Sequence, residues 1–198
     1  MNKKVEKGQA TRQRLVEVAT QLFATEGYEA TSIEAVLRAA GISRGALYHH
    51  FDTKETLFEA VLDAVETQVA VRLGAATRGI ADPIEATRAA WHAWLGMAGE
   101  QVVRRIVLLD APAAVGWVKW REIDARHGFG GLKRRLAALA AQGRLREDLV
   151  DIYAHMLLAA LMEAALVIAQ SDDFDTALQA GRDAVDGLLM TWVAGTAK

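Results

Sequence analysis

Cysteine is absent from the 198-residue chain, and proline occurs only twice, as Pro83 and Pro112. Without cysteine the chain can form no disulfide, no thiolate zinc site and no cysteine nucleophile. Proline is the poorest helix former, and alanine, which is abundant here, is the best. No stretch of useful length alternates between apolar and polar residues as a half-buried strand does. These absences predict an all-α fold.

The chain also lacks a long uninterrupted apolar run. Its longest mostly apolar stretch, Ala154 to Ala169, is interrupted by His155 and Glu163, whereas a membrane span needs about 20 mostly apolar residues. The first fourteen residues are polar and basic and lack the apolar core of a secretory signal. We therefore expect a cytoplasmic protein without a membrane span.

Three sequence motifs of common enzyme classes are absent too. The chain contains no GxGxxG, no phosphate loop and no HExxH. Its five histidines lack metal-ligand spacing, and the adjacent residues His49 and His50 would point about 100° apart on a helix. We predict no catalytic residue, no metal and no cofactor.

The net charge of −2 is close to neutral, but its distribution is uneven. A basic arm on a near-neutral chain is typical of a local phosphate-binding surface. A solvated chain end has the same composition, so the arm alone leaves both interpretations open. The basic residues of the arm, which face only Glu6, are Lys3, Lys4, Lys7, Arg12 and Arg14.

Apolar spacing and capping residues predict the first two helices. Apolar residues recur every three or four positions from about Thr11 to Glu26, and Gly27 follows where a left-handed cap is expected. Thr31 and Glu34 form a predicted capping box that opens the second helix.

A tight turn at Gly41 separates the second helix from a short third one, Arg44 to about His49, which Ser43 caps. The turn requires a positive φ that glycine adopts at low cost. Two helices joined in this way form a helix-turn-helix, which we place between Thr31 and Phe51.

The third helix has one apolar and one polar face. Leu47 keeps the helix in the core, and its neighbours Arg44, Gly45, Tyr48 and His49 line the adjacent face. A guanidinium can read guanine through O6 and N7, and tyrosine and histidine can donate to phosphate oxygens. Glycine removes side-chain bulk, so that the backbone can approach a groove.

Two further helix starts offer phosphate contacts. Thr31 and Ser32 precede the second helix, and Lys54 lies in the first turn of a helix that follows Asp52. The unpaired amides of a helix N-terminus attract anions. We therefore expect these residues to contact duplex DNA.

The segment from Thr11 to Leu57, TRQRLVEVATQLFATEGYEATSIEAVLRAAGISRGALYHHFDTKETL, closely resembles the N-terminal domain of the TetR family of bacterial repressors. The elements that carry the resemblance are Leu22-Phe23, Gly27-Tyr28, Ala30-Thr31-Ser32, Ala40-Gly41-Ile42-Ser43, Gly45, Leu47-Tyr48, His50-Phe51 and Lys54-Glu55. The resemblance implies that DNA is contacted by Ser43, Arg44, Gly45, Tyr48, His49 and Lys54.

The remainder of the chain is predicted to be helical without an internal repeat. We expect a helix-turn-helix domain over residues 1–52, called the head below, and a ligand-binding and dimerisation domain over residues 53–198. A long helix from Thr53 would join the two. The further helices are expected at about 83–98, 100–109, 113–127, 130–142, 148–171 and 174–194.

The last two helices are the predicted dimer interface. The first of them is apolar on nearly all sides, and the second carries one apolar stripe with small residues beside it. Burial within one subunit is the alternative. The resemblance favours a dimer, and a two-fold dimer implies a palindromic operator. The candidate interface residues are Leu161, Leu178, Gly181, Val185, Leu188 and Trp192.

Aromatic residues gather in the middle of the chain. Core packing explains any single tryptophan, whereas an aromatic pocket for a small effector explains their clustering and fits the resemblance. Carboxylates among tryptophans would favour a lipophilic cation. The candidate pocket residues are Trp91, Trp94, Asp110, Trp117, Trp120 and Asp124.

Together these features predict a homodimeric repressor that a small-molecule effector releases from a palindromic operator on double-stranded DNA. The alternative is a TetR-like factor without a small-molecule inducer, either controlled by a protein partner or architectural in role.

Overall fold

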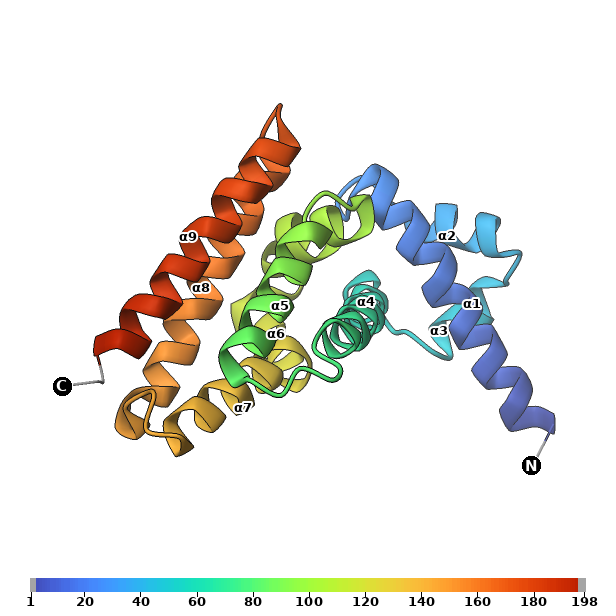
Figure 1. Ribbon diagram of the computed structural model, residues 1–198. Helices are drawn as coiled ribbons and strands as arrows, with labels where there is room; N and C mark the ends of the chain where they lie inside the picture. Colours follow the sequence, from blue (N-terminus) through green and yellow to red (C-terminus); the bar gives the residue numbers. More distant parts are fainter. Residues whose placement is uncertain (1–2, 196–198) are drawn as a thin grey trace. The chain divides into compact units, whose positions relative to one another are not determined.

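The computed structural model describes residues 3–195, and every regular element within that range is a helix (Figure 1). The all-α prediction is confirmed. The first helices are α1 (Lys3–Glu26), α2 (Ile33–Ala40), α3 (Arg44–Tyr48), α4 (Lys54–Ala76) and α5 (Pro83–Met97). They are followed by the π-helix η1 (Val103–Asp110), α6 (Ala111–Arg126), α7 (Gly128–Ala141), the 3₁₀ turn η2 (Glu147–Leu149), α8 (Val150–Gln170) and α9 (Phe174–Gly195).

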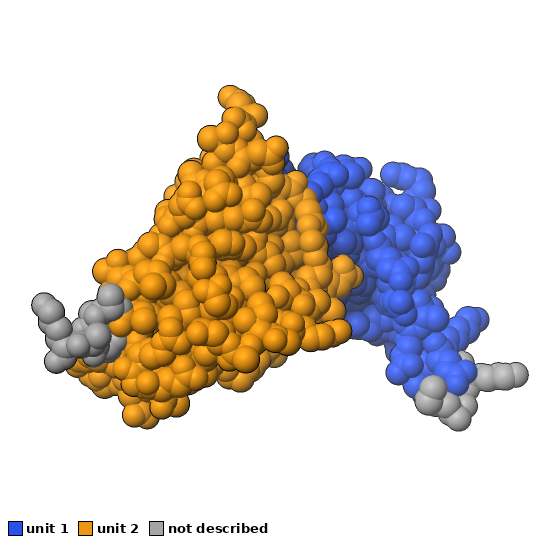
Figure 2. Space-filling model, viewed as in Figure 1, with its two compact units in different colours: residues 1–65, 101–123 blue, residues 66–100, 124–198 orange. Residues whose placement is uncertain are grey.

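The helices form two compact units (Figure 2). Unit 1 combines residues 1–65 with residues 101–123, and unit 2 combines residues 66–100 with residues 124–198. Unit 1 is thus larger than the head expected from the sequence, because a later segment that includes η1 belongs to it.

The core of unit 1 forms around α1, which packs against α2, α3 and η1. Leu15 and Leu47 are fully buried there. Phe23 and Phe58 are also fully buried, and their ring centroids lie 5.1 Å apart in an edge-on arrangement. Burying each large apolar side chain contributes about 1.5–3 kcal/mol, so these residues hold α1, α3 and α4 together.

Both helix ends that flank the predicted turn are confirmed. Gly41 has a φ of 68° in the left-handed region, and its amide donates to the carbonyl oxygen of Leu37 at 3.0 Å. The Ser43 hydroxyl accepts the amide of Ala46 at 3.3 Å and thereby caps α3. Gly27 also has a positive φ, of 88°, directly after α1.

The start of α2 differs from the prediction by one residue. Ser32, not Thr31, is the N-cap, and its hydroxyl accepts the amide of Ala35 at 3.1 Å. Thr31 is instead buried, and its hydroxyl donates to the carbonyl oxygen of Gly27 at 2.8 Å. The capping box with Glu34 is therefore wrong, because the Thr31 hydroxyl already closes the preceding turn.

Two other elements depart from the expected boundaries. Helix α1 begins at Lys3 rather than near Thr11, so most of the basic arm is helical. Helix α6 is interrupted at Gly116, whose φ of 75° and ψ of 156° are non-helical. That conformation is accessible essentially only to glycine.

Unit 2 is a bundle in which α8 packs against α5, α7 and α9, and α5 packs against α7 and α9 (Figure 1). Small residues permit close contacts in it. A Cβ on Gly181 of α9 would lie 2.7 Å from the side chain of Ile168 on α8, and 3.8 Å from that of Leu95 on α5. This glycine is therefore part of the packing within one chain.

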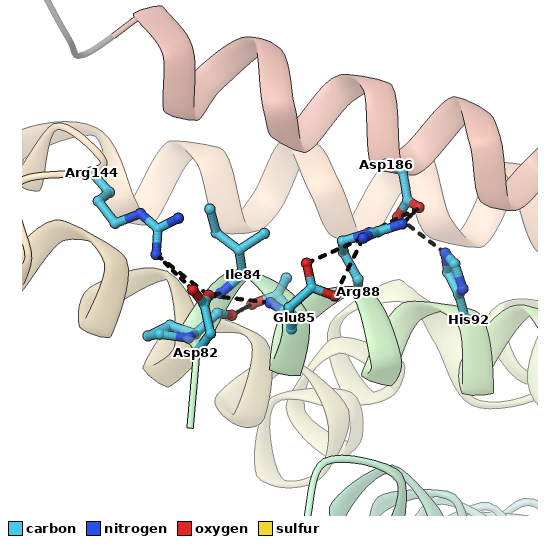
Figure 3. A network of polar contacts seen from close by, with 9 residues as sticks. Asp82, Ile84, Glu85, Arg88, His92, Arg144 and Asp186 are labelled. Atoms are coloured by element: carbon cyan, nitrogen blue, oxygen red, sulfur yellow. Dashed lines mark hydrogen bonds and ion pairs between the residues drawn. The ribbon is translucent and has the colours of Figure 1, made fainter. Parts of the chain in front are cut away.

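A polar network joins α5 to its neighbours in unit 2 (Figure 3). Asp82 caps α5 and accepts the amide of Ile84 at 2.7 Å. Asp186 of α9 pairs with Arg88 at 2.7 Å and with His92 at 3.0 Å. Burial would raise the pKa of Asp186, but the hydrogen bond from Arg88 and the charge of His92 outweigh it and lower that pKa.

Candidate nucleic-acid interface

The outer face of α3 is open to solvent as the sequence predicts. Arg44, Gly45 and His49 are exposed, and 41% of Tyr48 is accessible. Leu47, between them in sequence, is fully buried. The short helix thus presents one cation, two polar rings and a bare stretch of backbone on the same side.

Gly45 has no role in the fold of the isolated chain that requires a glycine. A Cβ at this position would meet no atom within 4 Å, and its φ is not positive. A helical glycine is destabilising by roughly 0.5–1 kcal/mol relative to alanine. Because nothing inside the described chain requires the missing side chain, its benefit is expected to come from a partner that approaches α3 closely.

Arg44 is ion-paired with Glu34 of α2. Both side chains are well exposed, at 62% and 59%, so the pair lies on the surface and not in the core. Surface pairs contribute only about 0–1 kcal/mol. The guanidinium can therefore exchange its carboxylate partner for another acceptor at little cost.

Lys54, predicted to contact a phosphate, makes contacts within the chain that the sequence did not predict. Its ammonium group donates to the carbonyl oxygens of Tyr28, Glu29 and Thr31 at 2.7, 3.3 and 3.1 Å. It also lies 4.3 Å from the ring centroid of Tyr28. An ammonium has three donors, and all three have carbonyl partners here. Lys54 thus anchors the α1–α2 connection to the start of α4.

Thr31 and Ser32, the two residues before α2, differ in their exposure to solvent. Thr31 is buried and engaged with Gly27, so its hydroxyl is turned away from solvent. Ser32 is exposed and caps α2. Of the two hydroxyls named from the sequence, only that of Ser32 is placed to meet a phosphate.

The N-terminal half of α1 borders the end of α3, a contact that sequence reasoning did not foresee. The guanidinium of Arg12 lies 5.2 Å from the ring centroid of Phe51. Burial lowers the pKa of His50, and the neighbouring charges of His49 and Arg12 lower it further. The basic arm thus continues the polar surface of α3, and its charge was the signal available in the sequence.

Asp110 of η1 holds the segment that follows α1. Its Oδ2 accepts the backbone amide of Tyr28 at 2.7 Å and the Nε–H of Arg105 at 3.1 Å. The Arg105 guanidinium also fills the space beside Gly27, where a Cβ would lie 1.9 Å from it. This carboxylate, predicted as a pocket residue, therefore fixes the connection between α1 and α2 in unit 1.

The predicted pocket residues are distributed over both units. In unit 2, Trp91 and Asp124 are buried and Trp94 is partly exposed. In unit 1, Trp120 is buried and 59% of Trp117 is exposed, with ring centroids 4.9 Å apart. The structure thus places the two tryptophan pairs in separate compact units.

The predicted dimer residues are only partly on the surface. Leu161 and Val185 are buried, and Gly181 contacts side chains of α5 and α8. Leu178 and Leu188 are partly exposed, and Trp192 stacks on Tyr153 with ring centroids 4.4 Å apart. Half of the set therefore packs within one chain.

Other apolar side chains of α8 and α9 are exposed instead. Ile152, Met156 and Val167 of α8 are 52%, 51% and 59% accessible, and Met190 of α9 is 49% accessible. The stretch Glu147–Gln170 is long and apolar enough to cross a membrane by composition, with a hydropathy of 1.9, and 28% of its 18-residue apolar window is buried. A single such helix is weak evidence for a span, and an unpartnered apolar face explains it equally well.

Comparison with known proteins agrees with this geometry. Residues 15–61 match the family described as "Bacterial regulatory proteins, tetR family". Residues 84–191 match "Tetracyclin repressor-like, C-terminal domain". The protein is thus a DNA-binding transcriptional regulator of the helix-turn-helix class and not an enzyme. The chain belongs to the TetR family.

Individual relatives extend the match beyond the head. The HTH-type transcriptional repressor AcnR of Corynebacterium efficiens is 30% identical over 158 residues, which cover 77% of this chain and 78% of that protein. Other curated relatives match over 51 to 64 residues only, and the matched segment is less than a third of their length.

Solved structures share the whole architecture. A TetR-family regulator from Pectobacterium atrosepticum is 32% identical, with a TM-score of 0.78 over 94% of this chain and 96% of that one. The structure of AibR in complex with isovaleryl coenzyme A and operator DNA has a TM-score of 0.63 and 22% identity, over 90% of this chain and 97% of that one.

Proposed function

We propose that this regulator is a cytoplasmic homodimeric repressor that binds a palindromic operator through α3 of each subunit. The observation that carries the proposal is Gly45, whose missing side chain serves no contact within the chain and lies among exposed polar residues. Arg44 would read a base, and Tyr48, His49, Ser43 and Ser32 would contact phosphates.

The second subunit would dock on the exposed apolar face of α8 and α9, which includes Ile152, Met156, Val167 and Met190. An apolar surface of this kind is removed from water when two copies pair. Leu178, Leu188 and Trp192 would border that face. Two-fold pairing presents two copies of α3 to half-sites about 34–36 Å apart or at a multiple of that distance.

A small-molecule effector bound by the C-terminal domain would control the operator affinity. The support is twofold: the match to a tetracycline repressor-like C-terminal domain, and buried aromatic and polar side chains in unit 2 such as Trp91 and Asp124. An effector shifts the equilibrium only through different affinities for the two states of the protein.

The direct test replaces Arg44 with alanine and measures affinity for a duplex recovered by selection. Loss of a bidentate base contact is expected to cost about 1–3 kcal/mol and to relax discrimination at one base pair per half-site. Unchanged affinity and unchanged base preference would remove Arg44 from the interface.

A further inference from the structure

Arg135 of α7 is a largely buried cation without a counter-ion among the described residues. Its Nε is shielded from solvent and has no hydrogen-bond partner among the described residues. Within residues 3–195 the guanidinium takes part in no ion pair. Burial lowers the pKa of Arg135, and the adjacent charge of Arg134 lowers it further. An arginine nevertheless stays protonated, so the buried charge persists.

A buried charge of this kind is unfavourable unless it is paired. Native proteins almost always pair buried charges or use them to bind ligands. The Arg135 guanidinium lies against the first turn of α7, 3.4 Å from the point where a Cβ on Gly131 would stand. A side chain at Gly131 would therefore contact the Arg135 guanidinium.

A second donor in unit 2 also has no acceptor. Trp91 of α5 is 2% exposed, and its Nε1 is buried without a hydrogen-bond partner among the described residues. Helices α5 and α7 pack against each other. Unit 2 therefore holds buried donors without an acceptor on the neighbouring helices α5 and α7, and a third, the Nε of Arg182, on α9.

The carboxylates named from the sequence are engaged. Asp110 accepts from Tyr28 and Arg105 in unit 1, and Asp124 has an interaction partner as well. The unsatisfied groups of unit 2 are thus hydrogen-bond donors. A site for a lipophilic cation would instead need acceptors or negative charge.

We infer that unit 2 binds a mostly apolar molecule carrying a carboxylate, phosphate or sulfonate group, and that Arg135 is the residue that binds this group. The guanidinium would supply charge-assisted hydrogen bonds to two anionic oxygens. The inference rests on the proposed function, because it specifies the chemical class of the effector.

The test compares two fluorescent probes that differ in charge. 1-Anilinonaphthalene-8-sulfonate is anionic, and N-phenyl-1-naphthylamine has the same rings without the sulfonate. The full-length protein is expected to bind the anionic probe about tenfold more tightly or better. Equal affinities for the two probes would overturn the inference.

Three variants locate the anion site. Arg135→Gln is expected to remove the preference for the sulfonate while leaving binding of the neutral probe unchanged. Arg134→Gln, the exposed neighbour on α7, should retain the preference. If Arg135→Gln does not fold, Arg135→Lys is tested in its place. A several-fold loss of affinity for the anionic probe alone supports the site, and unchanged affinity for both probes contradicts it.

Operator release separates this inference from the proposed function. Displacement of a selected duplex by the anionic probe from wild-type protein, but not from Arg135→Gln, supports both. If the anionic probe binds through Arg135 but does not displace the duplex, the anion site is supported and control of DNA binding by this probe is contradicted. Displacement by the neutral probe, equal in wild type and Arg135→Gln, retains effector control and overturns the anionic class.

Discussion

The Arg44 guanidinium is ion-paired with the Glu34 carboxylate across the helix-turn-helix. The residue expected to read a base is therefore held by an acidic neighbour when DNA is absent. In the proposed complex, DNA would displace this carboxylate before the guanidinium pairs with a guanine.

Removing the competing carboxylate should strengthen operator binding. Glu34→Gln is expected to raise affinity by up to about fivefold, since an exposed pair is worth about 0–1 kcal/mol. Glu17→Gln removes the same charge from α1 without affecting Arg44 and serves as the control. A drop in affinity for Glu34→Gln alone would show that the carboxylate positions the guanidinium for readout.

A methyl group on the exposed face of α3 should change protein stability and operator affinity in opposite directions. Gly45→Ala meets no atom of the chain, so the free energy of unfolding should rise by about 0.5–1 kcal/mol. Operator affinity should fall by about tenfold or more, because the new Cβ stands between the backbone and DNA. Gly74→Ala on α4, where a Cβ is equally unobstructed, should stabilise the protein without weakening binding.

Lys54 gives a choice between two measurable roles. If it anchors the α1–α2 connection, Lys54→Met should lower the free energy of unfolding by about 1–3 kcal/mol, because three carbonyl oxygens lose a charged donor. The salt dependence of DNA binding should then be unchanged. A phosphate contact would instead reduce the salt slope by about 1 per subunit at unaltered stability.

The Asp110 carboxylate should protect one particular amide from exchange. Asp110→Ala deprives the Tyr28 amide of its acceptor, and hydrogen exchange at that amide should accelerate. The free energy of unfolding should fall by about 1–3 kcal/mol. Asp148→Ala, whose exposed carboxylate pairs with Arg146, is the matched control. Unchanged protection at Tyr28 would contradict the assignment.

Charge on the exposed face of α8 should separate the subunits. Met156→Glu is expected to convert the dimer to a monomer in sedimentation, since each subunit would place a carboxylate against an apolar partner surface. Val71→Glu alters an exposed apolar residue of α4 and should leave the dimer intact. A wild-type chain that is monomeric at micromolar concentration would contradict the proposed assembly.

Local chemistry made the helix-turn-helix predictable. Gly41 and Ser43 act on neighbouring residues, so a left-handed turn and a cap follow from the sequence order alone. The cap at Ser32 could not be distinguished from one at Thr31, because the choice depends on the buried hydrogen bond from Thr31 to Gly27.

Contacts between distant parts of the chain could not be predicted from spacing. Asp110 meets Tyr28 across 82 positions, and no periodicity encodes that distance. The carbonyl partners of Lys54 lie in an earlier loop, so its contacts within the chain could not be predicted from neighbouring residues. The apolar stripe of α9 was predicted as a dimer face, and only the fold shows that Val185 packs inside one chain while Met190 is exposed.

The most direct test of the account is selection of bound sequences from a random duplex pool with the wild-type protein and with Arg44→Ala. The account predicts an inverted repeat whose half-sites lie about one helical turn or a multiple apart, and a relaxed base preference at one position per half-site in the variant. Enrichment of sequences without inverted symmetry, or no enrichment at low salt, would contradict paired reading by α3.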